Sequence, residues 1–161
     1  MAIPGYMWIK NEEGSPIRGP VKIKDRKGSM AILSFHHELR IPTDPDTGVL
    51  TGTRKHEPFV ITKEFCAATP ILNKACASGK SLGEVKLSWY RINPQGKEEE
   101  YFRHTLTNAK VISVEPIVED VKDRSKEKYG HLEKVAFRYE KIQWEYLDGN
   151  ISAYDTWLEK A

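Results

Sequence analysis

Apolar and polar residues alternate with a period of two through much of this chain, and that alternation constrains the fold more than any other feature. Val85, Leu87 and Trp89 alternate with Lys86, Ser88 and Tyr90, which is typical of a strand with one buried face. A turn follows at residues 93–96, and residues 101–106 return as the second strand of a hairpin. The same pattern predicts further strands at residues 6–9, 21–23, 31–40, 59–63, 110–118 and 132–146.

The last of these stretches changes phase part-way along. Its apolar side chains occupy odd positions up to Tyr139 and even positions from Ile142 onward. A slip of one residue would turn the apolar set to the wrong face of the sheet. We therefore expect a β-bulge near Glu140 and Lys141, which would restore the register and bend the strand. A turn at residues 148–150 then leads into a short final segment.

One segment, about residues 70–78, has the pattern of a helix. Thr69 is the candidate N-cap, Pro70 suits the first helical position and Gly79 suits the C-terminal cap. Its apolar residues form a single stripe, so a helix this short must dock on the sheet to be stable. Many short strands with one docked helix predict a mainly β fold. We expect a compact β-barrel of two antiparallel-rich sheets with one short flanking α-helix, and a single domain over residues 1–161.

Charge and hydropathy argue against several classes of protein. The 25 basic and 23 acidic side chains give a net charge of +2, which is too balanced for a general nucleic-acid binder. No apolar stretch approaches the ~20 residues that span a bilayer, and the first residues do not resemble a secretory signal peptide. Cys66 and Cys76 are expected to be reduced, partly buried thiols in a protein made in the cytosol. We expect neither nucleic acid nor membrane as a partner.

Residues that could perform catalysis or bind a metal do not converge in the sequence. His36 and His37 are neighbours on a predicted strand and so point to opposite faces, while His56 and His131 are predicted to face solvent. The sequence has no zinc-type spacing of cysteine and histidine, no nucleophile elbow and no phosphate-binding glycine loop. We expect no catalytic residue, no metal site and no cofactor, and hence a binding or assembly protein rather than an enzyme.

A long extended loop is expected at about residues 42–58. It contains three prolines and two glycines, which disfavour a core strand, and its aspartates can form Asx-turns. Connections of this length are uncommon in compact domains unless they are functional. We interpret the loop as an assembly arm that makes contacts through the stiff turn at Thr43–Asp46 and through the cations Arg54 and Lys55.

Four stretches of sequence together resemble the Hcp (haemolysin-coregulated protein) family of type VI secretion systems. They follow in order over nearly the whole chain: RKGSMAILSFHH at residues 26–37; IPTDPDTG at 41–48 with GTRKHEPF at 52–59; TKE at 62–64 with TPIL at 69–72 and ACASGK at 75–80; and LSWYR at 87–91 with YF at 101–102 and YEKIQWE at 139–145. The chain departs from the family pattern at His36, where an acidic residue is expected, and in its last dozen residues.

The resemblance implies a structural subunit of a hexameric ring, with rings stacked into the inner tube of a type VI secretion system. It implies three further partners: a spike protein of the VgrG type, a contractile sheath and effector proteins in the lumen. The tube would assemble in the cytoplasm and then be secreted without a signal peptide. The candidate assembly-loop residues are Thr43, Asp44, Asp46, Arg54, Lys55 and His56, and the residues of the structural family motif are Trp89, Tyr139, Lys141, Ile142 and Trp144.

Two other interpretations of the sequence stay open. A standalone ligand-binding β-barrel would hold a small apolar molecule and would run as one or four protomers rather than as a ring. A hydrolase would need a catalytic cluster, for which the sequence offers no candidate.

Overall fold

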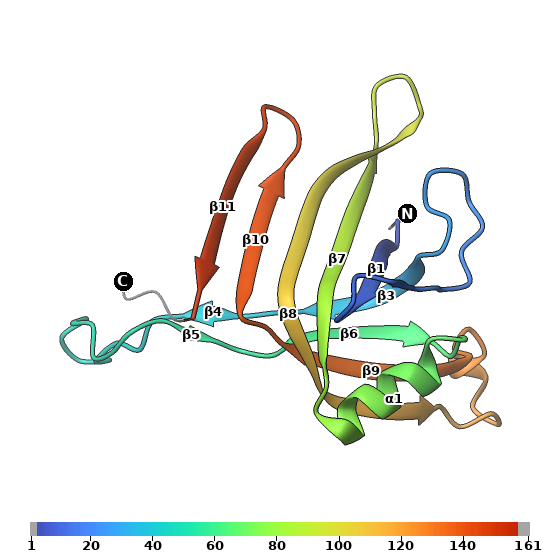
Figure 1. Cartoon of the computed structure of the whole chain (residues 1–161), viewed down its shortest axis with the longest axis horizontal. Helices are drawn as coiled ribbons and strands as arrows, with labels where there is room; N and C mark the ends of the chain where they lie inside the picture. Colours follow the sequence, from blue (N-terminus) through green and yellow to red (C-terminus); the bar gives the residue numbers. More distant parts are fainter. Residues whose placement is uncertain (1–2, 158–161) are drawn as a thin grey trace.

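The structure, a computed structural model, describes residues 3–157 as a mainly β fold (Figure 1). Its strands are β1 (Gly5–Asn11), β2 (Pro16–Ile17), β3 (Met30–His36), β4 (Leu39–Arg40), β5 (Lys55–His56), β6 (Phe59–Glu64), β7 (Ser81–Ile92), β8 (Glu98–Val118), β9 (His131–Arg138), β10 (Lys141–Tyr146) and β11 (Ile151–Thr156). The helices are α1 (Thr69–Ser78) and the short 3-10 helix η1 (Arg124–Lys126).

Six strands close into a barrel in the order β8-β7-β1-β3-β6-β9, and the pairing of β9 with β8 completes the circle. Every one of these pairs is antiparallel. The barrel strands belong to one large sheet, and β4 with β5 forms a second, two-stranded sheet. The mainly β barrel with one flanking helix, predicted from the alternation of apolar residues, is confirmed.

Strand β8 belongs to two parts of the molecule. Residues 102–107 pair with β10, whereas residues 110–118 pair with β9. Between the two stretches Asn108 adopts a left-handed conformation with φ 50°, which asparagine tolerates better than most residues. The first half of β8, the second half of β7, β10 and β11 thus rise together away from α1 as an extension that we call the outer sheet (Figure 1).

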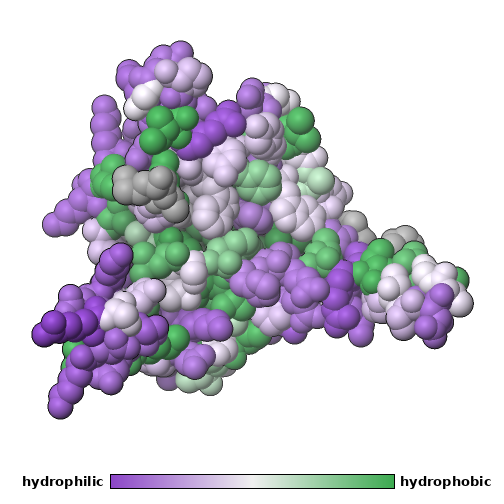
Figure 2. All heavy atoms as spheres, turned by 180° about the vertical axis from the view of Figure 1, so that it is seen from behind, coloured by the Kyte–Doolittle hydropathy of each residue, from purple (hydrophilic) through white to green (hydrophobic). Residues whose placement is uncertain are grey.

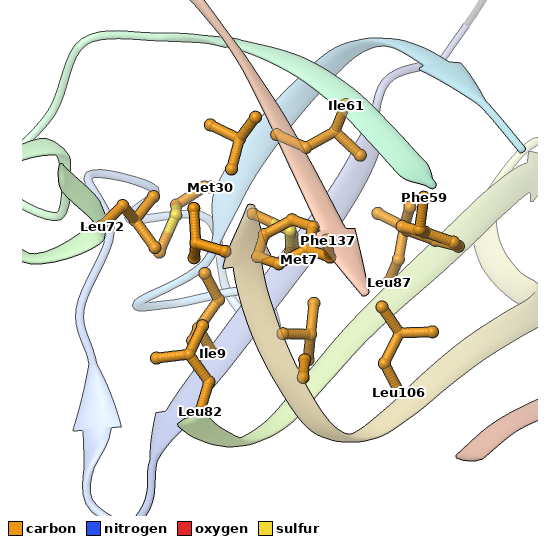
Figure 3. Packing of buried hydrophobic residues seen from close by; sticks show 14 of the residues in the cluster. Met7, Ile9, Met30, Phe59, Ile61, Leu72, Leu82, Leu87, Leu106 and Phe137 are labelled. Atoms are coloured by element: carbon orange, nitrogen blue, oxygen red, sulfur yellow. The ribbon is translucent and has the colours of Figure 1, made fainter. Parts of the chain in front are cut away.

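The barrel interior is filled by apolar side chains from alternate positions of its strands. Met7, Phe59, Leu87, Leu106 and Phe137 are fully buried and lie close together (Figure 3). Because side chains alternate across a strand, the same pattern that buries Val85 and Leu87 places Lys86 on the other face of β7. Packing of this density leaves no room for a ligand in the barrel centre.

Helix α1 docks on the barrel through Leu72 and Ala75, as its apolar stripe predicts. Gly79 ends it in the left-handed conformation expected of a C-terminal cap. The predicted N-cap is wrong, because Ala68 occupies that position without a side-chain cap. The Thr69 hydroxyl instead accepts a hydrogen bond from the Cys66 amide at 3.0 Å and donates one to Glu133 at 2.9 Å.

The strands predicted at residues 21–23 and 31–40 differ from the structure, and those predicted at 101–106 and 110–118 are parts of one strand, β8. Residues 21–23 form no strand and lie in the loop between β2 and β3, which is held by Arg26. The Arg26 guanidinium stacks 3.9 Å from the ring centre of Tyr90 and pairs with Glu98 at 2.5 Å. Backbone hydrogen bonds between Val21 and residues 28 and 29 also hold the loop, without forming a strand. The predicted strand at residues 31–40 is divided, because β3 ends at His36 and β4 pairs with β5 instead of β6.

The phase change between Tyr139 and Ile142 marks a corner rather than a bulge inside one strand. Strand β9 ends at Arg138 after pairing with β6 and with the second half of β8. Strand β10 begins at Lys141 and pairs with the first half of β8 and with β11. The apolar set changes phase because the two strands belong to different parts of the sheet, so the predicted bulge near Glu140 is wrong.

Candidate functional site

The long segment interpreted as an assembly loop is a hairpin that projects from the barrel, and we call residues 39–56 the arm. Strands β4 and β5 pair at its base, with Leu39 opposite His56. Farther out, Thr43 and Leu50 form an isolated bridge, and the Thr51 amide donates to the Pro42 carbonyl at 2.9 Å. The arm therefore has its own backbone ladder, and Lys55 and His56 lie in a strand rather than in the loop predicted for them.

The turn at the tip of the arm is built around Asp44. Its Oδ1 accepts hydrogen bonds from the amides of Asp46 at 2.8 Å and Thr47 at 3.3 Å, which is the Asx-turn predicted for this residue. Gly48 follows with φ 73°, a conformation that favours glycine, and its amide donates to the Asp44 carbonyl at 2.8 Å. These bonds fix the shape of the tip without help from the barrel.

Apolar side chains on the tip face solvent. Val49 and Leu50 are each 61% exposed, and Ile41 beside them is also exposed. Figure 2 shows the arm from behind as a lobe that projects from the body, with hydrophobic side chains among the hydrophilic ones. Several exposed apolar side chains on one projecting element are typical of a surface that another protein covers.

The base of the arm is tied to the last strand of the outer sheet through Arg54. Its Nε lies 2.6 Å from Asp155 Oδ2, and its Nη2 donates to the Thr156 carbonyl at 2.7 Å. Burial favours the neutral form of Asp155, but the hydrogen bonds from Arg54 and His56 outweigh it and hold the pKa of this carboxyl below its usual range. The pair is partly buried, so solvent screens it less than an exposed ion pair.

A chain of hydrogen bonds continues from Asp155 into the barrel wall. His56 Nε2 lies 2.5 Å from Asp155 Oδ2, and His56 Nδ1 lies 2.6 Å from the Tyr139 hydroxyl. The same hydroxyl lies 2.9 Å from His37 Nε2. With both rings neutral, all three bonds form if His56 donates to Asp155, Tyr139 donates to His56, and His37 donates to Tyr139. We call these four residues and Arg54 the anchor of the arm.

Burial shifts the pKa of two residues of the anchor, Tyr139 and His37. It raises the pKa of the Tyr139 hydroxyl well above its usual value, so this group stays protonated. Burial, together with the neighbouring rings of His56 and His36, lowers the pKa of His37 to about 4. His56 itself is 2% exposed, so the prediction that it faces solvent is wrong. Its hydrogen-bond partners Asp155 and Tyr139 come from β11 and from the corner after β9, so sequence analysis could not place them beside it.

Of the residues in the structural family motif, the structure brings only Tyr139 to the arm. Trp89 Nε1 donates to His104 Nδ1 at 3.0 Å, and Ile142 is fully buried in the core. Lys141 Nζ lies 4.4 Å from the ring centre of Tyr154, and Trp144 packs against the core from outside. Trp89 thus contacts β8 from β7, and Lys141 contacts β11 from β10.

Sequence analysis missed three residues at the base of the arm: His37, Arg138 and Asp155. Arg138 donates to the His56 carbonyl at 2.5 Å, and its guanidinium lies 5.7 Å from the ring centre of Trp157. The one local signal for this cluster was that Arg54 and His56 are two residues apart, so they share a face if the segment is extended.

Two other features are absent from the described residues. Among residues 3–157, no three histidine, cysteine, aspartate or glutamate side chains gather in a way that could hold a metal ion. The same residues contain no helix with the length and apolar character needed to cross a membrane. Cys66 and Cys76 are both free thiols and partly buried.

Comparison with known proteins identifies the family. The family model described as "Type VI secretion system effector, Hcp" matches residues 6–146. The chain belongs to the Hcp family. This confirms the resemblance drawn from the four ordered stretches of sequence, and it makes the chain a type VI secretion protein.

Individual Hcp proteins are similar to the chain over almost its whole length. The "Major exported protein" of Pseudomonas aeruginosa strain PAO1 is 34% identical over 166 residues, which cover 98% of this chain and 96% of that protein. A mutant of Hcp1 from the E. coli EAEC 042 pathovar is 46% identical, with a TM-score of 0.88 over 97% of this chain and 99% of that one. The structure of Hcp3 from Pseudomonas aeruginosa has a TM-score of 0.79 at 28% identity, over 98% and 100% of the two chains.

Proposed function

We propose that this protein is the tube subunit of a type VI secretion system, and that it acts as a single Hcp domain over residues 1–161. Six copies form a ring, and rings stack into an inner tube. The tube is propelled with a spike protein of the VgrG type inside a contractile sheath, and effector proteins travel in its lumen. The subunit assembles in the cytoplasm and is then exported from the cell. The name of the Pseudomonas relative, which calls it an exported protein, supports the last step.

The observation that carries this proposal is the combination of a fixed base and an exposed apolar tip in the arm. The anchor holds the base through charged and buried hydrogen bonds. The tip presents Val49 and Leu50 to solvent on a turn whose shape is already set. A rigid element loses little conformational entropy when it binds, so this arrangement suits contact with a neighbouring subunit or ring.

The candidate assembly residues divide into two groups by position. Thr43, Asp44 and Asp46 lie at the tip, where they shape or flank the apolar surface. Arg54 and His56 lie at the base and act by holding the arm in place. Lys55 lies exposed beside them on β5, so it is available for contact with a neighbour.

The protein has no enzymatic role in this proposal and needs no cofactor. The ligand-binding barrel is disfavoured because Met7, Phe59 and Phe137 fill the space in which a ligand would sit (Figure 3). A hydrolase is disfavoured because the anchor presents its histidines to a buried phenol and not to a cavity that could admit substrate.

Assembly of variants in the tip tests the proposal. We expect light scattering to give the mass of about six protomers for the wild type, and electron microscopy to show rings and stacks. Val49→Asp with Leu50→Asp places two charges in the apolar surface and should reduce stacking at unchanged thermal stability. Val121→Asp, at an even more exposed apolar residue outside the arm, is the control and should stack normally. A wild-type monomer, or normal stacks from the double variant, would contradict the proposal.

A further inference from the structure

A lysine and a glutamate form a buried ion pair below the start of α1. Lys63 on β6 and Glu133 on β9 are register partners, and Lys63 Nζ contacts Glu133 Oε1 directly. The side chains are 1% and 0% exposed. A pair this deep is costly to desolvate and is retained only when further polar contacts satisfy it.

One of those further contacts is the thiol of Cys66. Its Sγ lies 3.3 Å from Lys63 Nζ, closer than the Thr69 hydroxyl at 3.5 Å and about as close as the Glu64 carbonyl at 3.2 Å. The hydrogen bond from the Cys66 amide to the Thr69 hydroxyl fixes the backbone of the cysteine at 3.0 Å. The amine and the thiol are thus held in van der Waals contact by a rigid turn between β6 and α1.

The cluster also contains a group that can take a proton. Glu133 Oε2 is buried and has no hydrogen-bond partner, although Oε1 is bonded to both Lys63 and Thr69. An orphaned carboxylate oxygen at a fully buried residue is uncommon and marks a place where a proton can be accommodated. If the ammonium of Lys63 gives a proton to this carboxylate, the two side chains become neutral together and no unpaired charge is left in the core.

From these contacts we propose that Lys63 and Cys66 form a covalent sulfur–nitrogen bond when the protein meets a peroxide. The thiol of Cys66, which is partly exposed, attacks the peroxide; a sulfur–oxygen bond forms, the oxygen–oxygen bond breaks and water leaves. Lys63 passes one ammonium proton to Glu133. The free amine then attacks the sulfenic sulfur, forming the sulfur–nitrogen bond and releasing a second water. The sulfur is oxidised by two electrons and the peroxide is reduced.

The bond would join the end of β6 to the residue that leads into α1. It would replace the only cation of this buried cluster with a neutral crosslink, and it would protect Cys66 from further oxidation by removing its sulfenic acid. It is independent of ring assembly, because the arm and its anchor lie elsewhere in the fold. The proposal thus assigns this protein a reversible covalent modification at the joint between barrel and helix.

Mass spectrometry of the folded Cys76→Ser variant tests this bond, because the variant cannot form an internal disulfide. After treatment with hydrogen peroxide its intact mass should fall by about 2 Da, the loss of two hydrogens, and dithiothreitol should restore it. Trypsin should no longer cleave after Lys63, so residues 56–74 should appear as one peptide in place of residues 56–63 and 64–74. The protein should stay monomeric in a denaturing, non-reducing gel.

Two comparisons make the result decisive. Cys66→Ser, with Cys76 retained, should show no loss of 2 Da and should be cleaved normally after Lys63. The Cys76→Ser variant treated in concentrated urea should behave in the same way, because unfolding separates the amine from the thiol. The proposal is overturned if Cys66 in the folded Cys76→Ser variant gains about 16 Da or a multiple of it while Lys63 stays cleavable. It is equally overturned if neither residue changes under conditions that oxidise Cys76 in the wild type.

Discussion

The hydroxyl of Tyr139 lies 2.6 Å from Nδ1 of His56, although the two residues are 83 positions apart in the chain. Tyr139 stands at the corner between β9 and β10, and His56 stands at the base of the arm. The bond therefore joins the projecting hairpin to the place where the chain leaves the barrel for the outer sheet. Four of the predictions below concern this joint or the elements it connects.

Removing the Tyr139 hydroxyl should destabilise the protein. In Tyr139→Phe the ring stays, but buried His56 and half-buried His37 each lose a hydrogen-bond partner, which costs about 1–3 kcal/mol. Urea unfolding followed by tryptophan fluorescence measures the loss. Tyr154→Phe, at an exposed tyrosine of β11, is the matched control and should change stability by less than about 0.5 kcal/mol. Equal stability of the two variants would show that the hydroxyl contributes nothing.

Arg54 should matter more to the arm than Arg40, although both pair with a carboxylate at its base. The Arg54–Asp155 pair is partly buried at 2.6 Å, whereas the Arg40–Glu57 pair is largely exposed at 3.2 Å. Exposed pairs contribute about 0–1 kcal/mol. We expect Arg54→Met to increase hydrogen exchange of the amides of Thr51 and Gly48, and Arg40→Met to leave it nearly unchanged. Similar exchange in both variants would refute the role given to the anchor.

The stability of the folded chain should fall as the pH is lowered from about 6.5 to about 4. Burial lowers the pKa of His37 and of His104 to about 4, from the usual value of 6.5 that applies in the unfolded chain. In that interval the unfolded state binds protons that the folded state does not, so protonation favours unfolding. His104→Gln keeps an acceptor for Trp89 but does not titrate, and its stability should decline less steeply. Urea titrations at several pH values measure the free energy of unfolding of both proteins. If it falls equally steeply with pH in the wild type and in His104→Gln, the prediction is contradicted.

Shortening the arm should spare the barrel. Replacing residues 42–51 with a Gly-Ser turn removes the tip but keeps Arg54 and His56, and no residue of the core is lost. We expect an unchanged unfolding midpoint for the isolated protein, because few tertiary contacts of the tip are removed. Ring stacking seen by electron microscopy, and secretion in a cell that carries the system, should both decrease. Normal tubes together with normal export would return the arm to the status of an ordinary surface hairpin.

Helix α1 should depend chiefly on Leu72 for its docking. Leu72 is fully buried against the barrel, so Leu72→Ala should cost about 2–5 kcal/mol through lost burial and the cavity left behind. The neighbouring Ile71 faces solvent, and Ile71→Ala should cost under about 1 kcal/mol. Thermal unfolding of the two variants gives the comparison, and a larger effect for Ile71→Ala would mean that the docking face is wrongly assigned.

The parts of the fold that could be predicted are those fixed by local pattern. The strand around Val85 and Leu87 follows from alternation, and the end of α1 follows from Gly79, since each depends on residues close in sequence. The arm could be placed for the same reason, because its prolines and the Asx-turn of Asp44 are local features. Local patterns failed at residues 21–23, where backbone hydrogen bonds between Val21 and the nearby residues 28 and 29 close a loop and no strand forms.

The anchor could not be predicted because its partners meet only after the sheet has formed. His56 and Asp155 are 99 residues apart, and they meet because the register of β10 with β11 brings the end of β11 to the base of the arm. The Lys63–Glu133 pair was hidden for a similar reason. A lysine between a threonine and a glutamate has the pattern of a solvated face, and only the pairing of β6 with β9 shows that its ammonium is buried.

The continuity of β8 through Asn108 has a mechanical consequence. The outer sheet is connected to the barrel by an unbroken strand, which pairs with β7 from Glu98 to Lys110 and with β9 from Lys110 to Val118, and not by a flexible linker. A force applied to β10 or β11 therefore reaches the barrel as shear across antiparallel ladders. Under shear several hydrogen bonds must break at once, whereas peeling would open them one by one. The arm shares this stiffness because Arg54 and His56 attach it to β11. A push on any one of these elements displaces the whole subunit as a rigid body.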